Sequence, residues 1–503
     1  MSVVVVGNGM AGARFAAELR AREPRRPVVV FGAEPGRAYN RILLSDLLAG
    51  KLAEHDLALP EPPGALDLRA GVNVLAVDPA TRTVLADDGS RTRYDALVLA
   101  TGSRAVVPPI DGVWRDEETL LAGAATFRTL ADCREIVAGA GTARDVVVLG
   151  GGLLGLEAAR GLARRGLNVQ VVHARGHLME RQLDVHASRI LVETLAELGV
   201  SVRLDAVTEA IAGADRVRGV RLEDGTQIPA DLLVIACGVR PNPDLAVKAG
   251  LRVNRGIVVD DRMRTSEEAI YAIGDCAEHR GRVYGLVAPA WEQARVAADV
   301  ICGNGGAYAG SRLVTRLKAS GVDLAAMGDP HGDDEADEVV TFADPARRTY
   351  QKVVIRNRRL VAAILLGDNP TVGTLTQLFD RETVVPADPR SLLLGAVGGA
   401  SGGAGALRAG STVCECNGVT AGAIARAWVC GARSASEVAA TTRASTGCGS
   451  CRTTIEEFIG SLAAGSAGPG GSVESAGSAG SGGSVESAES DMDAPSTPQE
   501  VVA

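Results

Sequence analysis

Two stretches of the chain share one pattern, in which a short apolar run is followed by glycines and then by helically spaced apolar positions. The first stretch starts with the valine run at 3–6 and reaches a second apolar run within 26–34. The second stretch is ARDVVVLGGGLLGLEAARGLARRGLNVQVVH at 143–173. Continuous apolar runs of this length are typical of strands buried on both faces of a parallel sheet. We therefore predict two strand–helix–strand units, which indicate two nucleotide sites or a duplicated scaffold.

Two segments of low complexity lie further along the chain. Residues 395–410, GAVGGASGGAGALRAG, cannot pack a core, so we predict a glycine-rich flexible linker. Residues 463–503 consist largely of Gly, Ser, Ala and Glu and repeat the motif GSVES. Such a composition predicts a disordered tail.

The composition excludes some classes of protein. At 503 residues the chain is long enough for several domains. A net charge of −9 and a pI near 5.4 argue against nucleic acid as a partner, because binding to it requires a basic face. No apolar run approaches the roughly 20 residues that span a bilayer, so we expect no membrane interaction.

The cysteines indicate a reducing environment. The first apolar run lacks a basic flank and passes directly into glycines, so we interpret it as a buried strand rather than an export signal. In a chain that is not exported, nine cysteines favour metal ligation over disulfides. We therefore expect a cytoplasmic protein.

The first unit carries a phosphate-binding pattern, G-x-G-x-x-G, between its strand and its helix. Its glycines are Gly7, Gly9 and Gly12. Glycines permit a tight turn and a close backbone approach, and the helix N-terminus attracts a pyrophosphate. Glu34 is predicted to end the second strand, where its carboxylate can accept hydrogen bonds from a ribose. The alternative is a structural turn that binds no ligand.

The second unit repeats this pattern, with Glu157 close behind the glycines. Its glycines are Gly150, Gly152 and Gly155. The second strand is predicted to end in His173, which is followed by Ala174 and Arg175, so no carboxylate stands there. An acidic residue would select the 2′-hydroxyl of NAD, whereas an arginine can accept a 2′-phosphate. The residues alone therefore leave NADH and NADPH open.

Three further blocks carry a family resemblance. They are YDALVLATGS at 94–103, ADLLVIACGVRPN at 230–242 and IYAIGDCAE at 270–278. Together with the two glycine patterns, they resemble the flavoproteins that have two dinucleotide-binding domains. The resemblance implies FAD in the first unit and NAD(P)H in the second. It also implies that Asp275 binds the ribityl chain of the flavin, and we interpret the adjacent Cys276 as a buried small residue.

The resemblance assigns residues to both cofactors. The expected FAD site comprises Gly7, Gly9, Gly12, Glu34, Arg41, Thr101, Gly102, Gly274 and Asp275. The expected NAD(P)H site comprises Gly150, Gly152, Gly155, Glu157, His173, Arg175 and Gly238.

Residues 38–50, AYNRILLSDLLAG, correspond to the segment that carries a redox cysteine in disulfide reductases of this superfamily. The segment contains no cysteine, which excludes dithiol–disulfide chemistry there. It is similar instead to the segment of ferredoxin reductases and of the large subunit of bacterial NAD(P)H nitrite reductase. Many of these relatives have a lysine where this chain has Asp46, so the charge is reversed near the expected flavin.

Two blocks further along narrow the resemblance. Residues 315–329 and 360–382 resemble the nitrite reductase large subunit, including its small interface domain. The implied fold is α/β, with two Rossmann-like dinucleotide-binding domains, the interface domain and a small helical [2Fe–2S] domain. The expected domains are FAD-binding 1–112 and 250–312, NAD(P)H-binding 113–249, interface 313–394, linker 395–410, [2Fe–2S]-binding 411–462 and tail 463–503.

Four cysteines near the end form a C-x-C and a C-x-x-C. They are Cys414, Cys416, Cys448 and Cys451. Thiolates suit zinc, copper(I) or iron–sulfur, and structural zinc more often uses paired C-x-x-C motifs. The module resembles the bacterioferritin-associated-ferredoxin type of [2Fe–2S] domain, which favours that cluster over the zinc alternative. Cys430 lies between the pairs in an apolar helical stretch, and we interpret it as a packing residue.

The resemblance implies an electron path from NAD(P)H through FAD and the [2Fe–2S] cluster to a catalytic nitrite or nitrate reductase subunit. NADH is slightly favoured, because nitrite reductase relatives can use NADH with a histidine at this strand end. The sequence shows no second cysteine quartet, so we expect the electron-input part of such a reductase. A homodimer is compatible with this interpretation.

Two other functions stay open at this point. The first is a general ferredoxin or rubredoxin reductase with a fused iron–sulfur domain. The second is a non-enzymatic redox sensor, which would bind flavin without rapid NAD(P)H turnover.

Overall fold

The computed structural model describes residues 2–62, 64, 66–317, 319, 321–331, 336–369, 371–394, 409–414, 419–445 and 451–466. Most of the predicted linker and tail therefore lie outside the described residues.

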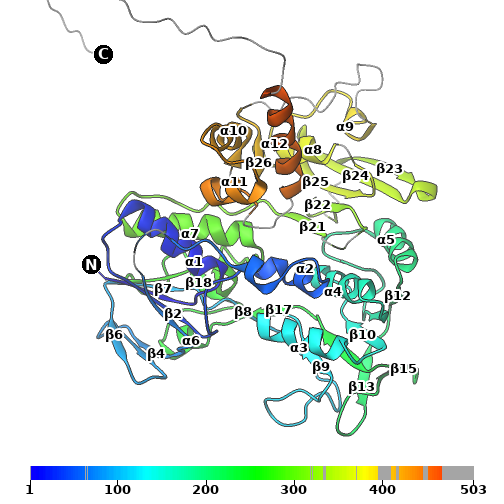
Figure 1. Cartoon of the computed structure of the whole chain (residues 1–503), viewed down its shortest axis with the longest axis horizontal. Helices are drawn as coiled ribbons and strands as arrows, with labels where there is room; N and C mark the ends of the chain where they lie inside the picture. The colour runs from blue at the N-terminus through cyan, green and yellow to red at the C-terminus, as the bar shows by residue number, and fades with distance from the viewer. Residues whose placement is uncertain are drawn as a thin grey trace, which may run out of the picture.

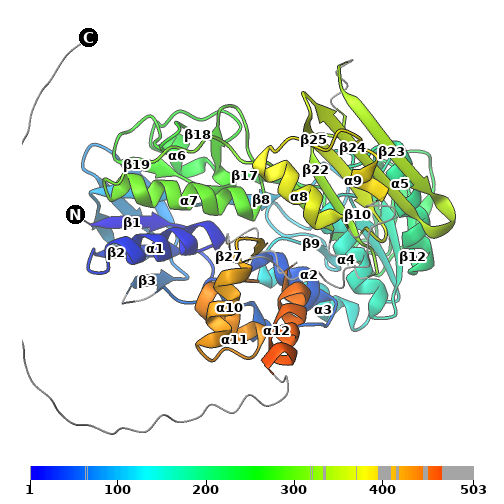
Figure 2. The same cartoon turned by 90° about the horizontal axis from the view of Figure 1, so that it is seen from above.

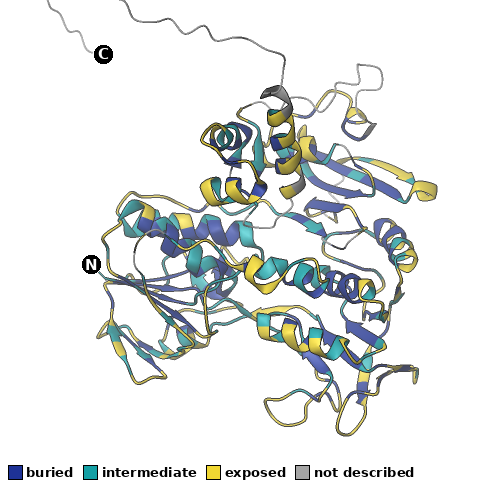
Figure 3. Ribbon diagram, in the orientation of Figure 1, coloured by how far each residue is buried: buried dark blue, intermediate teal, exposed yellow. Residues whose placement is uncertain are grey.

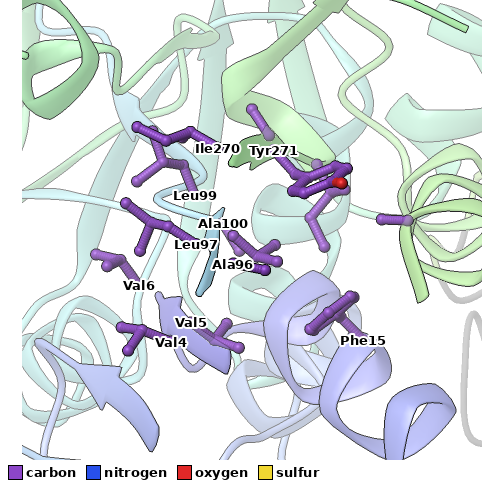
Figure 4. Packing of buried hydrophobic residues seen from close by; sticks show 14 of the residues in the cluster. Val4, Val5, Val6, Phe15, Ala96, Leu97, Leu99, Ala100, Ile270 and Tyr271 are labelled. Atoms are coloured by element: carbon purple, nitrogen blue, oxygen red, sulfur yellow. The ribbon is translucent and has the colours of Figure 1, made fainter. Parts of the chain in front are cut away.

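A five-stranded parallel sheet forms the first unit, in the order β19-β7-β1-β2-β3. Its strands are β1 (Val3–Val6), β2 (Val28–Gly32), β3 (Asp67–Ala70), β7 (Ala96–Leu99) and β19 (Ile270–Ala272). All four valines of β1 are buried, as expected of a strand with both faces covered. Helix α1 (Met10–Arg22) connects β1 to β2 and packs Phe15 against this sheet (Figure 4).

A second parallel sheet has the same design, in the order β12-β11-β10-β16-β9. Its strands are β9 (Ala124–Thr126), β10 (Asp145–Leu149), β11 (Asn168–Val172), β12 (Val200–Arg203) and β16 (Leu232–Ile235). Helix α4 (Leu153–Arg164) connects β10 to β11, as α1 connects β1 to β2. The two predicted Rossmann-like units are thereby confirmed.

Short strands extend and join the two units. The two-stranded sheets pair β8 (Ser103–Ala105) with β17 (Val239–Pro241) and β18 (Ile257–Val259) with β20 (Ala277–His279). One three-stranded sheet consists of β4 (Val74–Asp78), β5 (Thr83–Ala86) and β6 (Arg91–Arg93). The other consists of β13 (Thr208–Ala212), β14 (Gly219–Leu222) and β15 (Gln227–Pro229). The remaining helices here are α2 (Leu44–Leu48), α3 (Leu130–Ala140), α5 (Val185–Glu197), α6 (Asp244–Lys248) and α7 (Val287–Ile301).

An antiparallel sheet follows, in the order β21-β22-β25-β24-β23 (Figure 1). Its strands are β21 (Val314–Leu317), β22 (Leu324–Gly328), β23 (Glu338–Asp344), β24 (Thr349–Arg356) and β25 (Arg359–Leu366). Helix α8 (Val372–Arg381) packs on β22 and β25, and the short α9 (Ser391–Leu394) follows.

This antiparallel sheet shares a core with the second unit. Leu324, Tyr350 and Leu366 belong to the same buried apolar cluster as Leu191 and Leu195 of α5. The Tyr350 hydroxyl also donates to Asp184 Oδ2 at 2.6 Å, at the N-terminus of α5. Figure 2 shows the sheet lying beside α5 and β12.

The C-terminal module is small and mainly helical. It contains β26 (Thr412–Cys414), β27 (Val419–Thr420), α10 (Ala421–Val429), α11 (Ala435–Thr442) and α12 (Arg452–Ser466). Its core is formed by buried side chains such as Ile424, Val438 and Ile455, whereas the outer faces of its helices are exposed (Figure 3). Among the described residues, no helix of the chain is both long enough and apolar enough to cross a bilayer.

Candidate cofactor-binding sites

The glycines of the first unit have two different structural roles. Gly7 has a φ of +117°, and a Cβ there would overlap the Ala100 carbonyl oxygen. A Cβ on Gly12 would overlap the carbonyl oxygen of Gly7, so both glycines are required for strand–helix packing. A Cβ on Gly9 would meet no atom within 4 Å. Packing therefore does not explain Gly9, whereas a ligand approaching the backbone would, which fits a bound pyrophosphate.

Three other expected FAD residues, Thr101, Gly102 and Gly274, lie near this turn. The Thr101 backbone nitrogen would lie 3.3 Å from a Cβ on Gly7, and Gly102 follows it. A Cβ on Gly274 would lie 2.9 Å from the Cβ of Ala11, at the start of α1. Residues from β1, β7 and the segment after β19 thus meet at the carboxyl edge of the sheet, where ligands bind in this architecture.

Three of the expected FAD residues take part in arginine–carboxylate pairs. Arg41 pairs with Glu34, and the Tyr39 hydroxyl donates to Glu34 Oε2 at 2.7 Å. Arg128 Nη2 lies 2.6 Å from Asp275 Oδ2. Guanidinium groups suit phosphate oxygens, so the chemistry of Arg41 and Arg128 fits a cofactor that carries a pyrophosphate.

Arg128 is a residue that the sequence analysis missed. It donates to Ser103 Oγ at 2.7 Å as well as to Asp275, and its carbonyl oxygen accepts from Arg41 Nη1 at 3.1 Å. The feature of the sequence that could have indicated Arg128 is its position two residues beyond the carboxyl end of a strand, β9. That strand is only three residues long, AAT, and gives no apolar run in the sequence.

The second unit repeats the arrangement of glycines. A Cβ on Gly150, whose φ is +111°, would overlap the Ala236 carbonyl oxygen, and one on Gly155 would overlap the carbonyl oxygen of Gly150. A Cβ on Gly152 would again meet no atom within 4 Å. The second turn therefore leaves the same open space for a pyrophosphate.

The second strands of both units end earlier than expected. Strand β2 ends two residues before Glu34, and β11 ends one residue before His173. The last residue of β1 pairs with Phe31, and the last residue of β10 pairs with Val172. Glu34 comes three residues after Phe31, and Arg175 comes three residues after Val172. Arg175, rather than His173, is therefore the structural counterpart of Glu34. His173 is buried, whereas Arg175 is exposed.

The loops that leave the two sites are joined in a symmetric way. Strands β8 and β17 pair antiparallel, and each follows the corresponding strand of its own unit. The Gly102 carbonyl accepts from the Asn242 N–H at 2.9 Å, and the Gly238 carbonyl accepts from the Val106 N–H at 3.0 Å. The loops that carry the two expected nucleotide sites are therefore joined by backbone hydrogen bonds.

Helices α2 and α4 also join the units. A Cβ on Gly161 of α4 would lie 3.4 Å from the Ala49 nitrogen, just beyond α2. Glu157 lies one turn earlier on α4 and is buried. Asp46 of α2 pairs with Lys51 Nζ at 3.1 Å, so a nearby cation balances the reversed charge.

The structure describes two of the four expected cluster ligands. Cys414 and Cys451 are buried in the same apolar cluster of the C-terminal module. Cys416 and Cys448 lie outside the described residues. Cys430 is exposed at the C-terminus of α10, so its interpretation as a packing residue is wrong, because the apolar face of α10 ends before it.

The remaining cysteines are unsuited to thiolate chemistry. Cys276 is fully buried, as expected, and burial raises the pKa of its thiol. Burial also raises the pKa of Cys237 to about 11. Because a protonated thiol is a poor nucleophile, these side chains give no route for dithiol chemistry near neutral pH.

Comparison with known proteins decides the family. The sequence profile of the pyridine nucleotide-disulphide oxidoreductases matches residues 1–299 of the 503 residues. The chain belongs to the pyridine nucleotide-disulphide oxidoreductase family. Two further profiles match this oxidoreductase, the rubredoxin NAD+ reductase C-terminal domain at 314–383 and the BFD-like [2Fe-2S] binding domain at 412–461. The expected cofactors FAD, NAD(P)H and [2Fe–2S] are thereby confirmed.

The oxidoreductase has similar relatives in Bacillus subtilis (strain 168). It is 40 % identical to a nitrite reductase [NAD(P)H] and 36 % identical to an assimilatory nitrate reductase electron transfer subunit, each over 91 % of this chain. The chain spans 57 % and 59 % of the length of these two relatives. Among solved structures, the covalent putidaredoxin reductase–putidaredoxin complex is 28 % identical, with a TM-score of 0.72 over 79 % of this chain and 96 % of that chain.

Proposed function

We propose that this oxidoreductase passes electrons from NAD(P)H, through FAD and a [2Fe–2S] cluster, to a catalytic nitrite or nitrate reductase partner in nitrogen assimilation. The observation that carries the proposal is the similarity of 91 % of the chain, including the cluster module, to relatives named for these reactions. A reductase for free ferredoxin or rubredoxin needs no cluster module of its own. The module therefore favours electron transfer to a nitrite or nitrate reductase partner over reduction of free ferredoxin or rubredoxin.

The chain's own residues have distinct tasks in this proposal. Gly9 and Gly152 leave space for the pyrophosphates of FAD and NAD(P)H, and Arg41 and Arg128 supply positive charge at the first site. FAD, when bound, would supply the conversion of a two-electron hydride into single electrons, which is what a [2Fe–2S] cluster requires. Cys414, Cys416, Cys448 and Cys451 are the proposed cluster ligands.

The C-terminal module also lies close to the FAD unit. Arg443 follows α11 directly, and its Nη1 lies 3.9 Å from Oε1 of Glu18 in α1. Glu18 additionally binds Arg14 and Arg22, each at 2.7 Å. This contact places the module beside α1, and the glycine-rich linker predicted at 395–410 would let the module swing between the flavin and a partner.

A Gly152→Val substitution tests the second site. We expect the variant to retain FAD but to lose flavin reduction by NAD(P)H by at least about tenfold, because a side chain fills the space for the pyrophosphate. Stopped-flow bleaching of the flavin measures this rate. Gly373→Val, at an exposed position of α8 that is also open, is the matched control. Normal reduction in the Gly152 variant would refute the two-site proposal.

Arg175→Glu tests the nicotinamide preference. We propose that both nucleotides are used, and that the exposed Arg175 side chain, the counterpart of Glu34, is what permits NADPH. Reversing its charge should lower kcat/KM for NADPH about tenfold more than for NADH, because one phosphate contact is lost. Arg181→Glu, also exposed, is the control. An equal effect on both nucleotides would contradict the role given to Arg175.

The function itself is tested by reconstitution. The purified holoprotein should contain FAD, iron and acid-labile sulfide, and should oxidise NAD(P)H rapidly only with an acceptor. Adding a catalytic nitrite or nitrate reductase subunit should couple NAD(P)H oxidation to consumption of its substrate. Stoichiometric zinc without sulfide would refute the cluster, and coupling to ferredoxin alone would favour the reductase alternative. Flavin that NAD(P)H does not reduce rapidly would indicate a redox sensor.

A further inference from the structure

The middle glycine of the second turn is held from both sides by the segment after β11. The Gly151 N–H donates to His173 Nδ1 at 3.0 Å. The Gly151 carbonyl oxygen accepts from the Met179 N–H at 2.9 Å. Both polar groups of Gly151 are therefore occupied within the protein, and its neighbours Gly150 and Gly152 are fixed with it.

The His173 ring has no nitrogen left for a nucleotide. Because Nδ1 accepts a hydrogen bond from Gly151, the proton of the neutral ring is on Nε2. Nε2 lies 3.1 Å from the His177 carbonyl oxygen and 3.4 Å from Glu180 Oε2, so it donates into the same segment. The side chain is 9 % exposed. It therefore points into the fold rather than toward a ribose.

The backbone of the segment after β11 is bent at Met179, whose N–H donates to the Gly151 carbonyl oxygen. Met179 is 1 % exposed and has a φ of +49°, a left-handed conformation that is uncommon for residues other than glycine. The same bend brings its N–H to Gly151 and buries Leu178 against the turn. Such a conformation persists where the surrounding contacts determine it.

In each unit the middle residue of the turn contacts a residue at the end of the second strand, and the two units differ in which of these residues is the large one. A Cβ on Gly151 would lie 2.8 Å from His173 Cγ and 2.5 Å from Leu178 Cδ2. In the first unit the corresponding pair is Asn8 and Gly32, and a Cβ on Gly32 would lie 2.8 Å from Asn8 Cβ. Each unit therefore has one large and one small residue at these positions, in reversed order.

We propose that His173 is a positioning residue for NAD(P)H, which fixes the turn Gly150–Gly152 and makes no contact with the nucleotide itself. The proposal rests on the second unit being the NAD(P)H site, as proposed above. A fixed turn binds a pyrophosphate without first having to be ordered, so the clamp raises the affinity for the part that NADH and NADPH share. Discrimination between the two is left to Arg175.

The paired variants His173→Asn and His173→Gln test the clamp. Asparagine Oδ1 is bonded to Cγ, as imidazole Nδ1 is, so it can still accept from the Gly151 N–H. A glutamine amide reaches toward the position of Nε2 and leaves that N–H unpaired. We expect His173→Gln to raise Kd for both nucleotides about five- to tenfold, from the loss of one hydrogen bond, with kcat and FAD content unchanged. His173→Asn should restore most of the affinity.

The readout is the dependence of flavin reduction on NADH and NADPH concentration in the holoprotein. A changed ratio of NADH to NADPH affinity in either variant would mean that His173 contacts the ribose, which overturns the proposal. Affinity in His173→Gln equal to that of the unmodified protein would overturn it as well. Failure of the NAD(P)H site itself is recognised separately, because Gly152→Val would then leave flavin reduction intact.

A double-substitution cycle gives an independent test. Gly151→Asn alone should lower nucleotide affinity, because its side chain collides with His173 and Leu178. Adding His173→Gly recreates the Asn8–Gly32 pair of the first unit and should recover part of that loss. If the losses in affinity of the two single variants simply added in the double variant, the two positions would not be complementary in size. FAD content and thermal unfolding, measured on all variants, show whether a loss is local.

Discussion

Replacing Cys414 with serine is expected to stop electron delivery to the catalytic partner while NAD(P)H still reduces the flavin at its normal rate. Serine is a poor substitute for a thiolate that binds iron, so the cluster should be lost. The loss should exceed the roughly 10- to 100-fold cost of removing an outer-shell partner of a metal site. Cys414 lies in the core of the C-terminal module, which is separate from the cores of the two nucleotide units. Flavin chemistry should therefore survive.

The measurement compares two acceptors, a small artificial oxidant that meets the flavin directly and the physiological partner. Cys430→Ser is the matched control, because Cys430 belongs to the same module but is exposed and outside the expected ligand set. Iron and acid-labile sulfide are determined on both proteins. If the Cys414 variant still drives the partner at the native rate, the cluster is not on the electron path.

Gly9→Val is expected to abolish FAD retention. The space beside Gly9 is open, and a branched side chain there would occupy the place where the backbone must approach the pyrophosphate. We expect FAD affinity to fall by at least about tenfold, equivalent to about 1.4 kcal/mol, and every activity that needs flavin to fall with it. FAD released on denaturation of the purified protein measures retention. Gly373→Val is again the control, and a fully flavinated Gly9 variant would mean that the flavin site is misplaced.

Local patterns predicted the architecture because the relevant information is local. The valine run at 3–6 needs two covered faces, and Gly7 and Gly12 are required by contacts within one strand–helix unit. The same holds for the second unit. Strand–turn–helix units could therefore be recognised from the sequence without knowing what packs around them.

The contacts that complete the sites are long-range, and the sequence did not reveal them. Arg128 reaches Asp275 across 147 positions of the chain, from a strand too short to give a pattern. His173 was expected in the NAD(P)H site, but its ring turns inward because the adjacent Gly151 leaves room for it. The exact strand end decides which residue is the counterpart of Glu34, and a strand end is set by pairing with its neighbour.

The shared core of the antiparallel sheet and the second unit has a consequence for synthesis of the protein on the ribosome. Leu191 and Leu195 of α5 pack in one cluster with Leu324, Tyr350 and Leu366, which are translated more than a hundred residues later. The second unit therefore emerges with an apolar face that it cannot cover until β25 has left the exit tunnel. A stop codon shortly after α7, which leaves the first unit complete, should yield an aggregating product, whereas one after α9 leaves that face covered.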